Sequence, residues 1–261
     1  MPKLPSIAVW DATAACPMKC EFCFGPTAAD RPADLSTAAA KKLIDSLVAS
    51  RGVKTLIFSG GDPLSRADCL ALIRHAKKRG LKTVLHTTGL LVTPKFLSGA
   101  SGHLDRLNLP LDGSAADNLK MRRNPRHYAI VSSLLETLSR QNRIKLSVTT
   151  VVSKANRGAV VFLANYLRKF RLEKWFVYQF RAKGRGAAHA RKFEIPLREF
   201  NSLEKKARKI LSKSAHPKSV VFKEAAHDSF DDSYFLVSNA GKISSSRETV
   251  FAGQPPVSAK R

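Results

Sequence analysis

Three cysteines close together form the stretch of this chain best suited to chemistry. Cys16, Cys20 and Cys23 follow the spacing Cys-x3-Cys-x2-Cys, and Phe22 stands directly before the last of them. No apolar run is long enough for a signal peptide or a membrane span, so we expect a cytoplasmic protein without a membrane partner. Thiols stay reduced in the cytoplasm, where clustered cysteines bind metal or react more often than they form disulfides.

The cysteine pattern favours an iron–sulfur cluster over zinc. A structural zinc ion takes four protein ligands, but the fourth cysteine, Cys69, lies far along the chain and the nearest histidine is His75. Three thiolates suit a cluster in which one iron keeps an open position for a substrate or cofactor. Zinc binding and three unrelated buried cysteines are the alternatives. Cys69 follows a helical pattern and is expected to be a small buried residue.

Strands and helices that alternate along the chain must position this loop. Short connections between them predict parallel strands with right-handed crossovers, and therefore an α/β fold, a partial (β/α)6 TIM-like barrel. Ser65, with Asp68 three residues later, predicts a capping box at the start of the second helix. The expected strands are 6–13, 55–58, 83–85, 104–109, 145–152 and 175–180, and the expected helices are 36–50, 65–79, 94–97, 128–140 and 159–170.

The pattern changes after the sixth strand. A charged helix is expected over 197–211, followed by strands at 220–222 and 234–237 that we expect to pair antiparallel. The sequence therefore predicts a core barrel over residues 1–190 and a C-terminal α+β extension over 191–252 that packs on it. The remaining residues, 253–261, are expected to form a disordered tail.

Polar turns follow the expected strands at the end where a parallel sheet binds its ligands. Gly60, Gly61, Asp62 and Pro63 follow the second strand, residues 87–89 read Thr-Thr-Gly after the third, and Asp112 with Gly113 follows the fourth. Gln179 and Arg181 close the sixth strand on the face that carries Trp175 and Val177, and we expect both to point into the mouth of the barrel.

These motifs together resemble the radical S-adenosylmethionine (SAM) superfamily. Cys16-x3-Cys20-x-Phe22-Cys23 resembles its signature loop, in which three cysteines hold a 4Fe–4S cluster and SAM chelates the fourth iron. Reductive cleavage of SAM then gives a 5′-deoxyadenosyl radical, with an electron from a flavodoxin or ferredoxin. The resemblance implies that the cysteines are catalytic and that the following residues contact the cofactors: Phe22, Gly60, Gly61, Asp62, Pro63, Thr88, Asp112, Arg122 and Gln179.

Within that superfamily the chain resembles most closely the viperin-like small proteins that lack a SPASM domain. Viperin converts CTP to a 3′-deoxy-3′,4′-didehydro nucleotide, so the resemblance implies a nucleotide substrate. Arg181, Lys183 and Arg185 lie on a Gly-rich loop that could bind phosphate, and Tyr234 matches a tyrosine near viperin's substrate. A solvated loop and a core aromatic residue are the respective alternatives.

The charge of the chain widens the choice of substrate. Lys and Arg number 45 against 20 Asp and Glu, which gives a net charge of +25 and a sequence pI near 10.4. Such a surface attracts polyanions, so RNA is a second candidate substrate and a peptide a third. The non-enzymatic alternative is an iron–sulfur or zinc protein that binds nucleic acid and does not cleave SAM.

Overall fold

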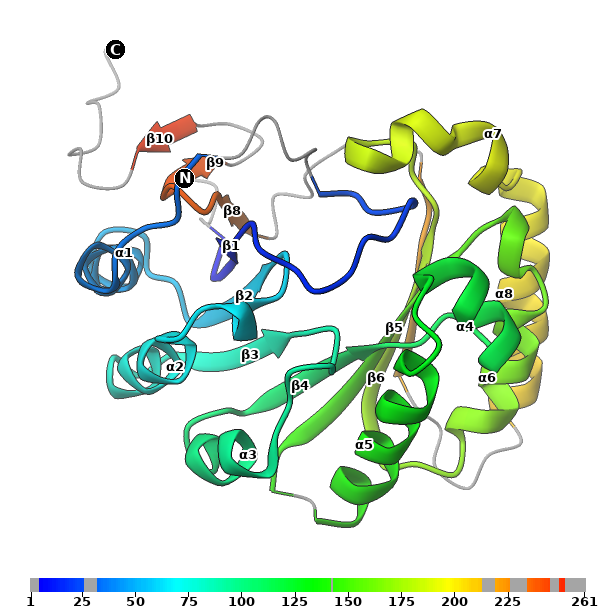
Figure 1. Ribbon diagram of the computed structural model, residues 1–261, viewed down its shortest axis with the longest axis horizontal. Helices are drawn as coiled ribbons and strands as arrows, with labels where there is room; N and C mark the ends of the chain where they lie inside the picture. Colours follow the sequence, from blue (N-terminus) through cyan, green and yellow to red (C-terminus); the bar gives the residue numbers. More distant parts are fainter. Residues whose placement is uncertain are drawn as a thin grey trace.

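The protein is built on one sheet of ten strands, shown by a computed structural model (Figure 1). The structure describes residues 5–25, 32–141, 143–212, 219–225, 234–244 and 249–251. The strand order is β10-β9-β8-β1-β2-β3-β4-β5-β6-β7. The strands are β1 (Ile7–Thr13), β2 (Thr55–Gly60), β3 (Lys82–His86), β4 (Arg106–Pro110), β5 (Lys145–Val152), β6 (Leu172–Gln179), β7 (Ser219–Lys223), β8 (Phe235–Val237), β9 (Lys242–Ser244) and β10 (Thr249–Phe251).

Helices on the outside of the curved sheet connect most of these strands (Figure 1). They are α1 (Thr37–Ala49), α2 (Cys69–Lys78), α3 (Pro94–Ala100), α4 (Ala115–Arg122), α5 (His127–Gln141), α6 (Ala159–Leu167), α7 (Ala190–Phe193) and α8 (Leu197–Leu211), with 3-10 turns η2 (Pro63–Ser65), η3 (Lys154–Asn156) and η4 (Gly184–His189). In the described part of the chain no helix is long and apolar enough to span a membrane.

Strands β1 to β6 pair in sequence order and are all parallel, as predicted. The expected antiparallel pairing of the later strands is wrong for β7, which joins β6 in parallel, and holds for β8 on one side only, because β8 joins β1 in parallel and β9 antiparallel. Strand β9 is also antiparallel to β10. The C-terminal strands thus extend the same sheet at both of its ends. The expected tail at 253–261 lies outside the described residues.

Alternation along the strands separates a closed core from an inner surface. Trp10, Phe58, Leu107, Val148 and Trp175 are at most 1% exposed and belong to the core between the sheet and the helices. Residues of opposite parity face the concave side, where they line cavities. The side chains that alternate with the core residues along each strand therefore face an internal space, which we call the lumen.

Two helix starts differ from expectation for identifiable reasons. The predicted capping box at Ser65 is wrong, because the carboxylate of Asp68 accepts hydrogen bonds from Arg66 and from Thr37 instead, and α2 begins after Asp68. Helix α4 was not predicted. Its start carries a full capping box between Ser114 and Asp117, and this sequence signal could have revealed it.

Candidate functional site

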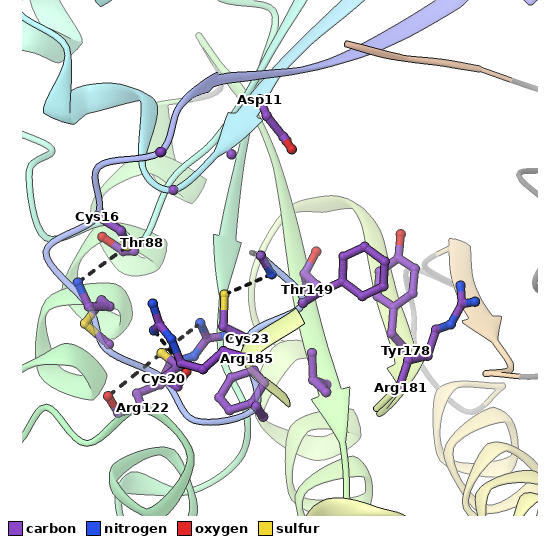
Figure 2. A pocket seen from close by; sticks show the side chains of 18 of the residues that line it. Asp11, Cys16, Cys20, Cys23, Thr88, Arg122, Thr149, Tyr178, Arg181 and Arg185 are labelled. Atoms are coloured by element: carbon purple, nitrogen blue, oxygen red, sulfur yellow. Dashed lines mark hydrogen bonds between the residues drawn. The ribbon is translucent and has the colours of Figure 1, made fainter. Parts of the chain in front are cut away.

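The three clustered cysteines lie on the loop that follows β1 and line one cavity of about 490 Å³ (Figure 2). Cys20 is buried, whereas Cys16 and Cys23 are partly exposed. The loop crosses the carboxyl ends of the parallel strands, where such folds bind ligands. The cysteines and the strand-end turns therefore meet at one place, as the sequence predicts.

Two glycines at the end of β2 allow this loop to approach the sheet. The Gly61 amide donates to the Thr13 carbonyl at 2.8 Å and the Asp62 amide to the Ala15 carbonyl at 2.8 Å. A Cβ atom on Gly61 would lie 2.2 Å from the Ala15 carbonyl oxygen, and Gly60 has a φ of 111°. Both positions therefore require glycine, and both residues line the cavity beside the cysteines.

Asp62 joins the second and third strand ends. Its carboxylate is fully buried and accepts hydrogen bonds from the Thr87 and Thr88 hydroxyls, at 2.9 and 2.6 Å, and from the Thr88 and Leu64 amides, at 3.0 and 3.1 Å. Pro63 is buried next to it, and Thr88 reaches the cavity. Asp62 thus positions Thr88, and its predicted contact with SAM stays a prediction.

Arg122 lies against the loop that carries Cys16, Cys20 and Cys23, which we call the cluster loop. Its Nε donates to Asp112 Oδ2 at 2.6 Å, its guanidinium carbon lies 4.9 Å from the centre of the Phe22 ring, and its Nη1 lies 4.0 Å from Cys20 Sγ. Burial by itself would lower the pKa of Arg122, but the charges of Asp112 and Cys20 outweigh it and raise that pKa. The structure therefore gathers four residues that the sequence predicted to share a site.

Gln179 differs from expectation in its surroundings. Its side chain donates to the Ile195 carbonyl at 2.8 Å and accepts from the Ala225 amide at 2.9 Å. Its strand neighbours Trp175 and Val177 face the core. Gln179 and Arg181, at the carboxyl end of the same face, both line the cysteine cavity, as predicted. The amide group of Gln179 is bonded to the main chain of the C-terminal extension, and its predicted contact with SAM stays a prediction.

The Gly-rich loop after β6 fastens the cluster loop. The Arg185 amide donates to the Gly25 carbonyl at 3.1 Å, the Gly186 amide to the Cys23 carbonyl at 3.0 Å, and Arg185 Nη1 to the Cys20 carbonyl at 3.3 Å. The close approach requires Gly184, where a Cβ would lie 2.2 Å from the Phe24 carbonyl oxygen. This clamp was not predicted, because it depends on main-chain contacts between distant segments.

The other predicted substrate residues are divided among neighbouring cavities. Arg181 lines the cysteine cavity and two others, and Lys183 lines one of those two, beside Lys154. Tyr234 lines the lumen cavity together with Tyr178, whose pKa burial raises to about 12. Their roles in substrate binding stay predictions.

Sequence reasoning missed Asp11, the single carboxylate among the described residues that line the cysteine cavity. It lies on β1 beside a register shift of the kind that re-aims a side chain. The side chain is exposed to the empty space of the cavity but enclosed by the surrounding protein, and this enclosure raises the pKa of Asp11 to about 6. Alternation along β1 could have indicated its inward direction.

The donor chemistry of this cavity fits an iron–sulfur cluster. Main-chain amides point at two of the sulfurs, from Met18 to Cys16 Sγ at 3.4 Å and from Gly25 to Cys23 Sγ at 3.3 Å, and such hydrogen bonds tune cluster-bound thiolates. Burial raises the pKa of Cys16 to about 11, so its thiolate needs a neighbouring positive ion. Within the described residues, no three His, Cys, Asp or Glu side chains are grouped closely enough to hold a single metal ion.

Comparison with known proteins agrees with this arrangement. The family model of the radical SAM superfamily matches residues 11–165. The AdoMet-dependent heme synthase of Methanosarcina barkeri is 32% identical over 190 residues, which are 71% of this chain and 54% of that protein. The PqqA peptide cyclase of Bradyrhizobium diazoefficiens is 38% identical over 96 residues, 36% of this chain and 25% of that protein.

Solved structures show the same fold. SuiB of Streptococcus suis, bound to its precursor peptide SuiA, superimposes with a TM-score of 0.76 at 14% identity, over 92% of this chain and 59% of SuiB. The enzyme anSMEcpe with bound AdoMet gives a TM-score of 0.71 at 13% identity, over 91% of this chain and 72% of that one. The expected partial TIM-like barrel is confirmed.

The likeness is partial in length, since the chain spans about half of the curated relatives it matches, 54%, 47% and 50% of three heme synthases. The family model nevertheless covers more than half of the chain, including the cysteine loop and the turns after β2, β3 and β4. The chain belongs to the radical SAM superfamily, whose members use a 4Fe–4S cluster and SAM.

Proposed function

We propose that this protein is a radical SAM enzyme that takes a hydrogen atom from an anionic organic molecule bound in the lumen. Cys16, Cys20 and Cys23 would hold the cluster, which with bound SAM and an electron from a flavodoxin or ferredoxin would supply a carbon radical. The protein's own side chains bind the substrate, orient it toward the cysteine cavity and exclude water from the reaction.

The observation that carries this proposal is a second cavity that adjoins the first. It has a volume of about 1190 Å³ and lies inside the curved sheet. Arg122, Thr149 and Tyr178 line both cavities, so the two spaces share a wall or opening at these residues. A molecule in the lumen would therefore lie beside the place where the cluster and SAM are expected.

The deep part of the lumen is polar. In the register of the sheet, His86 is opposite Asn108, Asn108 opposite Ser147, and Ser147 opposite Lys174, so one level of four adjacent strands carries four polar side chains. Ser147 donates to Asn108 at 2.9 Å, which satisfies these two side chains. Lys174 has no hydrogen bond or ion pair within the described residues, and its ammonium lies 6.0 Å from the centre of the Phe176 ring.

A second cation with unused donor capacity lies one level deeper. Arg106 donates through Nη1 to Glu173 at 3.1 Å, but its buried Nε has no hydrogen-bond partner in the described structure. A buried donor without a partner costs about 1–3 kcal/mol, so a bound acceptor would recover that cost. Lys174 and Arg106 together therefore favour a phosphate or a carboxylate of the substrate.

This chemistry suits several substrates that the sequence and the relatives suggest. A nucleotide, as in viperin, has phosphates, whereas the tetrapyrrole of a heme synthase and the peptide of PqqA peptide cyclase have carboxylates. The net charge of +25 favours polyanions in general, including RNA. We favour a small molecule over RNA because Lys174 and the Arg106 Nε donor lie inside the sheet and not only on its surface.

Binding of small anions tests the proposal. We would measure the thermal unfolding midpoint of the anaerobically reconstituted protein with CTP, with pyrophosphate and with a short RNA, for the wild type and for Lys174→Gln. Lys145→Gln, which removes an exposed charge on the same sheet, is the matched control. We expect CTP or pyrophosphate to stabilise the wild type and the control by several degrees more than Lys174→Gln. Equal stabilisation of all three proteins, or RNA binding alone with a steep salt dependence, would argue against a lumen site.

A further inference from the structure

Arg122, at the end of α4, lies close enough to Cys20 to act on the cluster as well as on SAM. Figure 2 shows Arg122 beside Cys20, where its Nη1 lies 4.0 Å from Sγ, and the same guanidinium stacks on Phe22 at 4.9 Å. The side chain of Arg122 is only 11% exposed. Its positive charge therefore acts on the sulfur with little screening by water.

Asp112 holds this guanidinium in place. The Arg122 Nε to Asp112 Oδ2 distance is 2.6 Å, and the other carboxylate oxygen accepts from the Val151 amide at 2.8 Å. The main chain of Asp112 is fixed in turn by Asn118, which accepts from its amide at 3.2 Å, and by Asn156, which donates to its carbonyl at 2.9 Å. Arg122 thus cannot turn away from Cys20 without breaking a buried ion pair.

A fixed cation beside a cluster ligand has a definite electrostatic consequence. Reduction adds one electron, which the external reductant supplies, and no bond forms or breaks. The reduced state carries more negative charge, so a neighbouring positive charge stabilises it and raises the reduction potential. Resting on the proposed function, we propose that the Asp112–Arg122 pair positions a guanidinium against Cys20 to raise the reduction potential of the cluster.

Other cations near the loop do not share this geometry. Arg185 donates to the main-chain carbonyl of Cys20 and not to its sulfur. Arg123 follows Arg122 directly, but its side chain is 61% exposed and pairs with Glu21. Arg123→Gln therefore removes the same charge from the next residue without removing a contact to a cysteine sulfur, and it serves as the matched control.

The test is a redox titration of the reconstituted cluster without SAM, with dithionite as reductant and electron paramagnetic resonance as readout. Compared with the wild type, we expect Arg122→Gln to lower the equilibrium constant for reduction by about tenfold or more, which is about 59 mV for one electron. Arg122→Lys keeps the charge and should shift the potential less, whereas Arg123→Gln should match the wild type. Iron and sulfide contents identify variants that assemble the cluster.

The outcomes separate this inference from the proposed function. Equal potentials for Arg122→Gln and Arg123→Gln, or a more positive potential for Arg122→Gln, would overturn the inference even if SAM is cleaved. If Arg122→Gln does not fold, Arg122→Lys decides the matter, since it keeps the charge but loses the Nε contact to Asp112 that holds the cation against Cys20. Its potential should then lie below that of the wild type, and an unchanged potential would overturn the inference. A wild-type protein that forms the cluster but never cleaves SAM would contradict the proposed function alone.

Discussion

Removing the Asp62 carboxylate should destabilise the fold more than a typical loss of one surface charge. The carboxylate is fully buried and accepts hydrogen bonds from two hydroxyls and two main-chain amides of the β2 and β3 ends. In Asp62→Ala the hydroxyls can turn to other acceptors, but the amides of Thr88 and Leu64 lose theirs. At about 1–3 kcal/mol for each unsatisfied donor, the free energy of unfolding should fall by about 2–6 kcal/mol.

The conservative change should have a smaller effect in the same direction. Asp62→Asn keeps one acceptor oxygen but turns an amino group toward threonine donors, so we expect a loss of about 1–3 kcal/mol. Asp45→Asn is the matched control, because Asp45 is 42% exposed and its partners are His75 and Arg79. Exposed pairs of this kind contribute about 0–1 kcal/mol.

Urea unfolding without the cluster measures these differences, with tryptophan fluorescence and circular dichroism as two probes whose agreement checks for a two-state transition. A change of a few kcal/mol is easily resolved against a typical total of about 5–15 kcal/mol. If Asp62→Ala shifts the urea midpoint no more than Asp45→Asn, the carboxylate does not join the strand ends as described.

Three further changes test other parts of the site. Gly61→Ala would bring a Cβ to 2.2 Å from the Ala15 carbonyl oxygen and should abolish most cluster assembly, measured as iron per chain. Gly158→Ala is the control, because a Cβ there has open space and should not reduce the iron content. Equal iron contents in the two variants would contradict this prediction. Burial, and then the charge of Arg122, lower the pKa of His127 to about 3. The neutral histidine therefore contributes its full stabilisation above pH 6.5. As the pH falls toward 3, the unfolded state takes up the proton first and the free energy of unfolding falls by up to about 1.4 kcal/mol per pH unit. His127→Gln should therefore lose less stability than the wild type between pH 7 and pH 5, and parallel losses would refute the assignment. The pKa of Asp11 is raised to about 6, so its ionisation opposes folding above that pH. In urea unfolding, Asp11→Asn should therefore be more stable than the wild type at pH 8 but equal to it at pH 4. An equal gain in stability at both pH values would show that charge is not the cause.

Local signals in the sequence predicted the parts of the site that depend on local geometry. The cysteine spacing predicted the cluster loop, and the turns at Gly60, Thr88 and Asp112 were predicted at one end of the sheet because parallel strands bring their carboxyl ends together. The capping pair Ser114 and Asp117 would also have predicted α4, had it been used.

Contacts between distant segments could not be predicted in this way. The clamp of Arg185 on the cluster loop depends on main-chain atoms whose meeting no residue type specifies. Alternation along β6 likewise gives two faces and does not say which one meets the core. Trp175 decides this, since its large side chain fills the space between sheet and helices. The parallel pairing of β7 and β8 likewise depends on open edges of the whole sheet.

Cleavage of SAM tests the central claim most directly. The purified protein would be reconstituted anaerobically with iron and sulfide and given dithionite and SAM, and 5′-deoxyadenosine would be measured by mass spectrometry, with Cys20→Ala as the control. We predict 5′-deoxyadenosine from the wild type and none from the variant. A wild type with a complete cluster that makes no 5′-deoxyadenosine, and whose electron paramagnetic resonance spectrum does not change when SAM is added, would contradict the account.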